Sequence, residues 1–413
     1  MLPALIVGVI LIGGCVSVPT RVETQHWTCR AEVYELSTQD GMLYARTSGG
    51  IVCLRNGEVR AVREMPARAP EPVVSGSGDG AFLAATARYS GKRVATFWGG
   101  EKVFEVLENS LEPLFERPPA EGDYSMLALG SVLFAGTNRG LFVWSGGDWT
   151  RVDLGGELPF SRVHGVGKIG REYVVGGISG AALGEPGNWN TISREPVRQV
   201  LQVDKDVWIV YGSGALDKLS SDGRLHSDVL HGAAKRPWTS SATASKNGLL
   251  LGGLGGWVFK GATFIEKYPQ ELSGQVVTAI VSNGKQLFVG TQEKGLAQVD
   301  GNRIRWINPG TGLADTWVTA LCSARGRLYA ATATAGLYEI RQGRALKVGT
   351  PSEKIRQTML FNNQIVIGAL DGAWKLSGKK WEKLATNSQE TTFLSEIDGS
   401  MWVGTPTGTY IID

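Results

Sequence analysis

The chain ends partway through a repeat, and its other end carries a segment that matches the missing part. Related segments recur from Tyr44 onward, and the last copy stops at Asp413 before its fourth strand. An orphan segment with the look of that strand, Gln25-His26-Trp27-Thr28, stands ahead of the first copy. Because the two ends complete one repeat between them, the chain is expected to close into a ring. We predict that residues 21–28 pair beside residues 408–412.

Each copy contains an apolar strand that ends in small residues, as in Leu287-Phe288-Val289-Gly290-Thr291. The second residue of this strand recurs at a mean spacing of about 40 residues, which is typical of β-propellers. The anchors are Tyr44, Leu83, Phe134, Val174, Trp208, Leu250, Phe288, Tyr329, Val366 and Trp402. We therefore predict an all-β fold, a single closed β-propeller of about ten four-stranded blades. The alternative is a ring of seven or eight blades with an irregular N-terminal extension.

Glycine and tryptophan support this register. In most copies a glycine follows the anchor by six residues, where a hairpin between two strands needs a positive φ or a close backbone approach. Trp149, Trp189 and Trp381 follow their anchors at a constant distance and are assigned to the outer strands of their blades. Trp27 has a similar context but no anchor before it. It is therefore expected on the outer strand of the blade that contains Trp402.

The segment from Thr311 to Leu321, followed by Gly326-Arg327-Leu328-Tyr329-Ala330-Ala331-Thr332 and Gly336-Leu337-Tyr338, resembles the propeller repeat of two-component regulators. That repeat has a Gly-Leu-Pro loop, a strand ending in Gly-Thr and a Gly-Leu turn. Ala314 replaces the proline here. The resemblance covers residues 275–345 and 391–412 and is weak before residue 125. It implies a blade and does not specify a ligand.

The first 20 residues differ from the rest. Leu2 to Ile12 is apolar, and Ile12-Gly13-Gly14-Cys15 resembles the lipobox of bacterial lipoproteins. The apolar run is too short to span a bilayer but suits a signal peptide, although the usual positive residues before it are absent. We expect a signal peptide at 1–14, a tether at 15–20 and the propeller domain at 21–413. A buried or disordered apolar N-terminus is the alternative.

This N-terminus implies lipidation of Cys15, which would anchor the protein to a membrane of the bacterial cell envelope on its extracytoplasmic side. Val16 is not the aspartate that retains some lipoproteins at the inner membrane, so the outer membrane or cell surface is expected. The remaining cysteines, Cys29, Cys53 and Cys322, are an odd number, so at least one is a free thiol. We expect all three to be small buried apolar residues, and the protein to be monomeric.

Composition and motifs indicate binding rather than catalysis. The chain has 42 basic and 39 acidic residues, a net charge of +3, and no stripe of basic and aromatic residues, so nucleic acid is not an expected partner. Its four histidines show no metal-ligand spacing. Gly165-Val166-Gly167-Lys168-Ile169-Gly170 fits a dinucleotide motif, but no helix follows it. No catalytic residue, metal site or cofactor is predicted.

Ligands of propellers usually bind at the mouth, where each blade's inner strand begins. Basic and aromatic residues are predicted there, and these are Arg162, Arg198, Arg236, Trp238, Trp317 and Arg356. Arginine and tryptophan suit an anionic or carbohydrate ligand, or a protein, through bidentate hydrogen bonds and stacking. The alternative is that they are ordinary rim side chains. The predicted function is a binding or scaffold module. A propeller enzyme of lyase or glycosidase type, and a sensor subunit of a signalling complex, are the other candidates.

Overall fold

The computed structural model describes residues 24–30, 32–55, 58–66, 83–97, 100–108, 110–120, 123–129, 131–152, 154–160, 162–227, 229, 239–245, 248–260, 263–264, 272–283, 286–300, 303–324, 326–384, 386 and 389–413. The signal peptide and tether predicted at 1–20, with Cys15, lie outside these residues, as do Arg236 and Trp238. Within the described ranges the protein is built of β-strands and the short 3-10 helix η2 (Pro309–Thr311). No helix there is long and apolar enough to cross a membrane.

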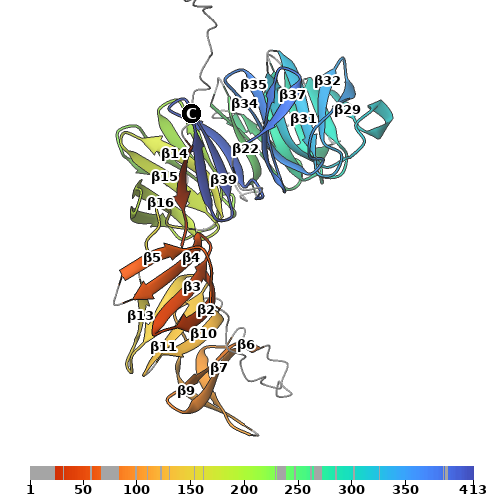
Figure 1. Ribbon diagram of the computed structural model, residues 1–413. Helices are drawn as coiled ribbons and strands as arrows, with labels where there is room; N and C mark the ends of the chain where they lie inside the picture. The colour runs from red at the N-terminus through yellow and green to blue at the C-terminus, as the bar shows by residue number, and fades with distance from the viewer. Residues whose placement is uncertain are drawn as a thin grey trace, which may run out of the picture.

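Seven four-stranded antiparallel sheets form the larger part of the molecule, which we call the ring (Figure 1). Six of them contain consecutive strands: β14 (Val163–Ile169), β15 (Glu172–Gly177), β16 (Gly180–Glu185) and β17 (Asn188–Ser193); β18 (Val197–Val203), β19 (Asp206–Tyr211), β20 (Leu216–Leu219) and β21 (Leu225–His226); β22 (Thr239–Ser245), β23 (Gly248–Gly253), β24 (Val258–Lys260) and β25 (Thr263–Phe264); β26 (Val277–Asn283), β27 (Gln286–Thr291), β28 (Leu296–Asp300) and β29 (Arg303–Ile307); β30 (Val318–Ala324), β31 (Arg327–Thr332), β32 (Leu337–Arg341) and β33 (Arg344–Val348); β34 (Ile355–Phe361), β35 (Gln364–Ala369), β36 (Gly372–Ser377) and β37 (Lys380–Lys383).

The seventh sheet of the ring joins the two ends of the chain, as predicted. It contains β38 (Phe393–Ile397), β39 (Ser400–Thr405) and β40 (Gly408–Ile412), and β1 (Thr24–Thr28) completes it as the outer strand. Strand β1 pairs antiparallel with β40 from Thr24 opposite Ile412 to Thr28 opposite Gly408. Trp27 packs edge-on against Trp402 at 4.8 Å between ring centroids, which confirms the blade assigned to it.

Three further sheets form a separate unit, which we call the arm. They are inserted between β1 and β14: β2 (Val33–Gln39), β3 (Met42–Thr47), β4 (Gly50–Arg55) and β5 (Glu58–Val62); β6 (Leu83–Tyr89), β7 (Lys92–Phe97), β8 (Lys102–Val106) and β9 (Leu111–Glu116); β10 (Asp123–Leu129), β11 (Val132–Thr137), β12 (Gly140–Trp144) and β13 (Trp149–Val152). Figure 1 shows the arm below the ring, in red to yellow.

The hydrophobic core shows which sheets are neighbours. Among the described residues, seven buried clusters each join two adjacent sheets of the ring, and together they form a closed circuit. The cluster around Trp27 and Val166 closes the circuit between the sheet of β38 and the sheet of β14. Two further clusters join β6–β9 to β10–β13 and β10–β13 to β2–β5. No cluster of the described residues contains both arm strands and ring strands.

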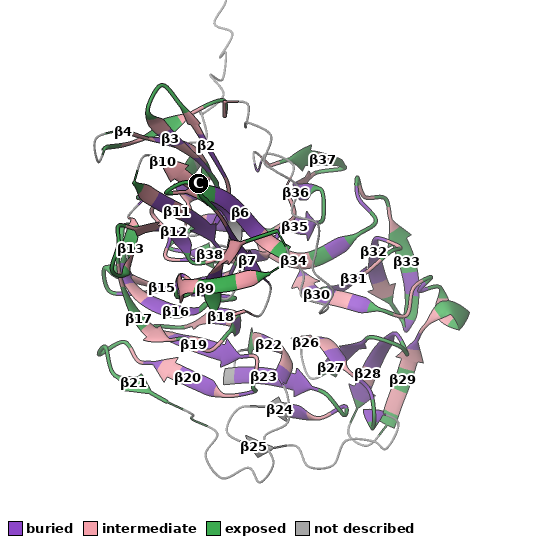
Figure 2. Ribbon diagram, turned by 90° about the horizontal axis from the view of Figure 1, so that it is seen from below, coloured by how far each residue is buried: buried purple, intermediate pink, exposed green. Residues whose placement is uncertain are grey.

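The ring therefore has seven blades, which is the lower of the numbers considered from the sequence, and a single ring of about ten blades is not confirmed. The described residues do form ten four-stranded sheets, so the repeats were counted correctly. Sequence spacing alone does not show that three of them stack apart, with β10–β13 in the middle. Buried residues gather on the inner and middle strands of the blades, and the outer strands are more exposed (Figure 2).

The structure corrects one predicted anchor, Leu83. Leu83 lies in β6, the first strand of its sheet, whereas the other nine anchors lie in second strands. The equivalent residue is Val94 in β7, and Gly100 then follows it by six residues, as in the regular copies. The apolar run that begins at Leu83 resembles the second-strand sequence, so apolar pattern alone could not distinguish the two strands.

The arm leaves the ring at the end where the inner strands begin, which we call the mouth. Thr28, the last residue of β1, lies opposite Gly408, which in turn lies opposite Thr405 at the end of β39. The neighbouring Gly404 pairs with Phe393, the first residue of the inner strand β38. Since paired residues share one end of an antiparallel sheet, Thr28 lies at the mouth.

The two chain segments that connect the arm to the ring are bonded to each other. The backbone N–H and the hydroxyl of Thr28 donate to Glu157 Oε2 at 2.8 and 2.7 Å, and the N–H groups of Glu157 and Leu158 donate to the Thr28 carbonyl. Arg30 Nη1 donates to the carbonyl of Leu154 at 2.9 Å. Burial alone would raise the pKa of Glu157, but the hydrogen bonds from Thr28 outweigh it and lower the pKa below its usual value.

The glycines of the segment 165–170 have a packing role. A Cβ on Gly165 would lie 2.6 Å from the backbone nitrogen of Val200, and one on Gly167 would lie 2.7 Å from a methyl group of Val207. Both glycines are on the inner strand β14, and both facing residues belong to the next blade. The first two glycines of the motif therefore lie within a strand and allow two blades to approach closely.

Candidate functional site at the mouth of the ring

The inner strands of the ring begin with a shared irregularity. In β14, β18, β22, β26, β30 and β34 the pairing register shifts between the first and third residues, so the second residue is a bulge. A bulge redirects a side chain out of the regular alternation between the two faces of a sheet. Thr392, just before β38, holds the equivalent place in the seventh blade.

We call the seven residues at this position the collar, and they are His164, Arg198, Ser240, Thr278, Thr319, Arg356 and Thr392. Three of them are arginine or histidine and four carry a hydroxyl group, and none is acidic. Because the blades follow one another in chain order, Arg356, Thr392, His164 and Arg198 occupy four consecutive blades. The remaining blades of the collar carry only hydroxyl groups. The collar therefore has a basic half and a neutral half.

Collar side chains also connect each blade to the next. Thr392 Oγ1 donates to the carbonyl of Val163 at 2.6 Å, and Thr319 Oγ1 donates to the carbonyl of Ile355 at 2.7 Å. Two further bonds of this kind run from Ser240 to Val277 and from Thr278 to Val318. Such bonds hold neighbouring inner strands in register.

Two basic residues on adjacent blades of the collar also bond to the next blade, His164 to the first residue of its inner strand and Arg198 to the second. His164 Nδ1 lies 2.7 Å from the carbonyl of Val197, and because a carbonyl only accepts, Nδ1 carries the proton. Arg198 Nε donates to the carbonyl of Ser240 at 3.1 Å. The Arg198 side chain is exposed at the mouth, yet the surrounding protein removes part of its solvent, and this desolvation lowers its pKa. The guanidinium remains charged at neutral pH, and since its bond to a described residue uses Nε, the two terminal nitrogens can form a fork onto an anion.

The other predicted site residues lie around this collar. Arg162 comes one residue before β14, with φ 47°, and its Nη1 lies 3.7 Å from Glu390 Oε2. Trp317 holds the same place before β30 and is 37% exposed. Its backbone N–H donates to Asp315 Oδ1 at 2.9 Å. Arg356 is an exposed collar residue.

The structure thus places Arg198 and Arg356 at one repeat position, and Arg162 and Trp317 at another, two residues earlier. His164 shares the collar position, although the sequence indicated no role for the four histidines. The signal that could have found it is the alignment of the inner strands, in which His164 stands where Arg198 and Arg356 stand.

Carboxylates near the mouth are bonded within the rim. Glu390 faces Arg162, and Glu353 forms an ion pair with Lys347 at 2.7 Å. Glu195 accepts a hydrogen bond from the N–H of Ser213 at 3.2 Å. The ion pairs offset the charges of Glu390 and Glu353, whereas the neutral amide of Ser213 leaves the negative charge of Glu195 in place.

Among the described residues, no group of histidine, cysteine and carboxylate side chains is arranged to hold a metal ion. Cys29, Cys53 and Cys322 are buried, as expected, and burial raises the pKa of the Cys322 thiol to about 12. A buried thiol with so high a pKa is unreactive at neutral pH. The described cysteines therefore contribute to packing.

No known protein family profile matches the chain, and no curated protein sequence matches it. Solved structures do match. The extracellular domain of the hybrid two-component system BT3049 from B. thetaiotaomicron superposes with a TM-score of 0.53 at 14% identity, over 92% of this chain and 61% of that one. The extracellular domain of the BT4673 system from the same organism gives 0.51 at 14% identity, over 92% of this chain and 63% of that one. The chain thus spans less than two thirds of either domain. At this identity the likeness establishes a shared β-propeller fold.

Proposed function

We propose that this protein is an extracytoplasmic binding module, anchored to the bacterial envelope by a lipid on Cys15, which captures an anionic ligand at the mouth of its ring. The observation that carries the proposal is the composition of the collar, in which Arg356, His164 and Arg198 lie within four consecutive blades and no carboxylate occupies an equivalent position. Arginine forks onto carboxylates and phosphates with two parallel hydrogen bonds, so the ligand carries such groups.

The basic half of the collar is supported by its surroundings. Lys354 precedes β34, so further positive charge belongs to this half of the collar, whereas Arg162 before β14 is paired with Glu390. Trp317, on an adjacent part of the rim, offers a partly exposed ring for stacking. An acidic saccharide, which combines carboxylates with apolar ring faces, suits these residues, and an acidic segment of a protein is the other form that this ligand can take.

A sensor subunit of a signalling complex is the second candidate. It is favoured by the structural likeness to extracellular domains of two-component systems, together with the sequence resemblance to their propeller repeat. In this version the ligand at the mouth changes the contact between the propeller and a separate membrane protein. Co-purification of a membrane protein from envelope fractions, with and without ligand, distinguishes a sensor from a simple binding module.

The test uses trigalacturonate as an anionic probe and galactotriose as its neutral counterpart, with binding measured by calorimetry. We expect trigalacturonate to bind and the affinity to fall as salt is added, because charge attraction is screened over about 8–10 Å near physiological ionic strength. Arg198→Gln combined with Arg356→Gln should weaken binding by at least about tenfold, since each charge-assisted hydrogen bond contributes about 1.5–3 kcal/mol.

A matched control removes the same charge elsewhere. Arg303→Gln combined with Arg344→Gln neutralises two exposed arginines on the outer strands β29 and β33. If this control weakens binding as much as the collar variant does, the attraction is a property of net charge and not of the mouth. Equal binding of trigalacturonate and galactotriose would also contradict an anion site.

A further inference from the structure

Tryptophans on outer strands connect neighbouring blades by one repeated hydrogen bond. The indole N–H of Trp189 donates to the carbonyl of Glu157 at 2.6 Å, and that of Trp381 donates to the carbonyl of Gly349 at 2.6 Å. In the arm, Trp149 donates in the same way to the carbonyl of Glu116 at 2.7 Å. In each case the acceptor lies 32 or 33 residues earlier, at the end of the preceding sheet or connection. This bond is a structural latch, and it explains Trp149 without any ligand.

The arm carries additional aromatic residues around its latch. Trp149 pairs across the hairpin with Trp144, whereas Trp189 pairs with Gly184 and Trp381 pairs with Leu376. The ring therefore forms the same latch with glycine or leucine at the paired position. The latch does not require a second tryptophan.

The residue before the acceptor carbonyl shows the same difference. It is Phe115 in the arm, but Gly156 and Val348 at the corresponding places in the ring. The rings of Phe115 and Trp144 stack in parallel across the two sheets, with centroids 4.2 Å apart and an interplanar angle of 6°. Trp149 is tilted against Trp144 by 51° at 5.6 Å. Three aromatic side chains thus meet at this boundary between two sheets of the arm. At the corresponding boundaries in the seven-bladed ring, glycine or aliphatic residues stand in the places of Phe115 and Trp144.

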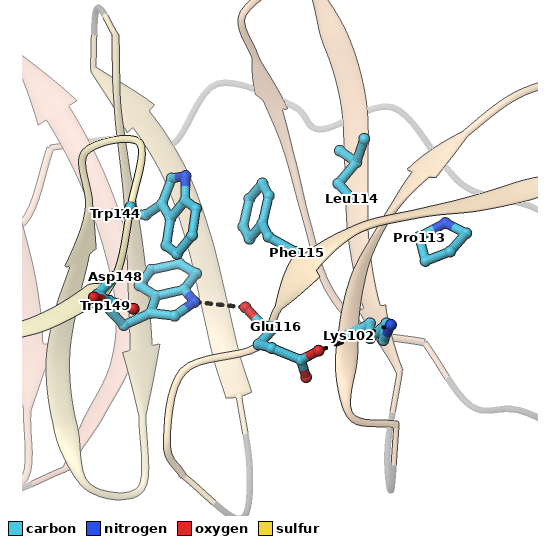
Figure 3. Close-up of a pocket in the computed structure, with 9 residues that line it drawn as sticks. Lys102, Pro113, Leu114, Phe115, Glu116, Trp144, Asp148 and Trp149 are labelled. Carbon is cyan, nitrogen blue, oxygen red and sulfur yellow. Dashed lines mark hydrogen bonds and ion pairs between the residues drawn. The ribbon is translucent and has the colours of Figure 1, made fainter.

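These rings line a cavity of about 360 Å³ between the sheets β6–β9 and β10–β13, which we call the seam pocket (Figure 3). That volume falls within the range of about 300–1,000 Å³ that is usual for small-molecule sites. Figure 3 shows Trp144, Phe115 and Trp149 grouped on one side, with Lys102 and the carboxylate of Glu116 near the lower edge and Asp148 beside Trp149.

The charges at the pocket edge are mixed. Lys102 Nζ lies 3.8 Å from Glu116 Oε1, with exposed side-chain fractions of 48% and 71%, so this ion pair is loose and open to solvent. Asp148 is exposed. The edge therefore offers an ammonium donor and two carboxylate acceptors. A cationic ligand would meet one group of its own sign and an anionic ligand two, whereas hydroxyl groups can both accept from lysine and donate to a carboxylate.

We propose that the seam pocket binds a neutral saccharide, with the apolar face of a sugar ring against the aromatic cluster and its hydroxyls bonded to Lys102, Glu116 and Asp148. This site is separate from the mouth and does not depend on the proposed function. It differs from the mouth in charge, so salt should have little effect on its affinity.

The experiment titrates the full protein with cellotetraose, maltotetraose and chitotetraose, measured by tryptophan fluorescence and by calorimetry. We expect at least one of these neutral sugars to bind and to change the fluorescence. The combination Phe115→Val with Trp144→Leu gives the arm the seam residues of the blade that carries Trp381, with the latch retained. It should fold normally and lose at least about tenfold in affinity, which corresponds to about 1.4 kcal/mol.

Two further variants keep the test informative if that double variant is destabilised. Asp148→Asn changes only an exposed side chain and should weaken the same sugar severalfold, whereas Arg198→Gln with Arg356→Gln at the mouth should leave it unchanged. The proposal is overturned if none of the three sugars binds, or if a sugar binds equally to the wild type and to both seam variants. Binding of tetramethylammonium in place of the sugars would assign the aromatic cluster to a cationic ligand instead.

Discussion

Replacement of Trp27 by alanine tests how the chain ends close the ring. Trp27 is 9% exposed and packs edge-on against Trp402 at 4.8 Å and Tyr173 at 5.1 Å, so it joins the closing blade to the next blade. Removing a buried tryptophan side chain costs about 3–5 kcal/mol. For domains of about 150–250 residues, each kcal/mol of lost stability lowers the melting temperature by about 2–4 °C, and the shift is smaller for larger domains. We therefore expect the melting temperature of the ring to fall by about 5–10 °C.

The assay is differential scanning calorimetry, which can also separate the ring from the arm. Since no buried cluster of the described residues contains strands of both units, the arm should unfold in its own transition and keep its melting temperature in this variant. Trp317→Ala is the control, because Trp317 is 37% exposed and should cost no more than about 1 kcal/mol.

A second substitution in the same pair sharpens the result. Trp27 and Trp402 are in contact, so their alanine substitutions should be non-additive by about 0.5–1.5 kcal/mol, the usual coupling of an aromatic pair. If Trp27→Ala melts within about 1 °C of the wild type, the closing strand does not stabilise the ring and the reasoning is refuted.

The remaining predictions concern the joint, the collar and the anchor. Glu157→Gln should lower the free energy of unfolding by about 1 kcal/mol in urea at pH about 7. Because the pKa of Glu157 is lowered in the folded protein, this difference between the variant and the wild type should disappear as the pH falls through that pKa. A difference that stays constant with pH would contradict this reasoning. Thr392→Val should lower the free energy of unfolding by about 1–2 kcal/mol, because the hydrogen bond to the Val163 carbonyl is lost. Thr319→Val is the comparison at another junction of the collar. If neither variant changes the melting temperature, the collar bonds do not stabilise the ring. Cys15→Ser should leave the protein unlabelled by fatty acid in its native host. If the serine variant is still labelled, Cys15 is not the lipidated residue.

The repeat made most of the fold predictable. Alternation of short apolar runs with glycine turns specifies strands and hairpins locally, so the ten sheets and the outer-strand place of Trp149, Trp189 and Trp381 were accessible from the sequence. The closing strand was accessible because Trp27 has no anchor of its own. These features depend on residues that are near one another in the sequence or at its ends.

The division into ring and arm was accessible only as the alternative of a seven- or eight-bladed ring with an irregular N-terminal extension, because the division depends on which sheet faces which. The faces of all ten sheets carry similar small and β-branched residues, and the strand order of the arm, with β10–β13 between the other two sheets, leaves no mark in the spacing. The collar shows the same limit. Arg198 and Arg356 were found by their charge, but His164 became visible only when the bulge gave the inner strands a common register.

Excision of the arm tests the central claim most directly. Arg30 and Gly156 are close in space, since a Cβ on Gly156 would lie 3.3 Å from the Arg30 nitrogen, so a short Gly-Ser linker can replace residues 31–155. We predict that this seven-bladed ring folds cooperatively, binds trigalacturonate with unchanged affinity and no longer binds the neutral sugar. An unfolded product, or a folded ring without trigalacturonate binding, would contradict a self-contained ring with its ligand site at the mouth.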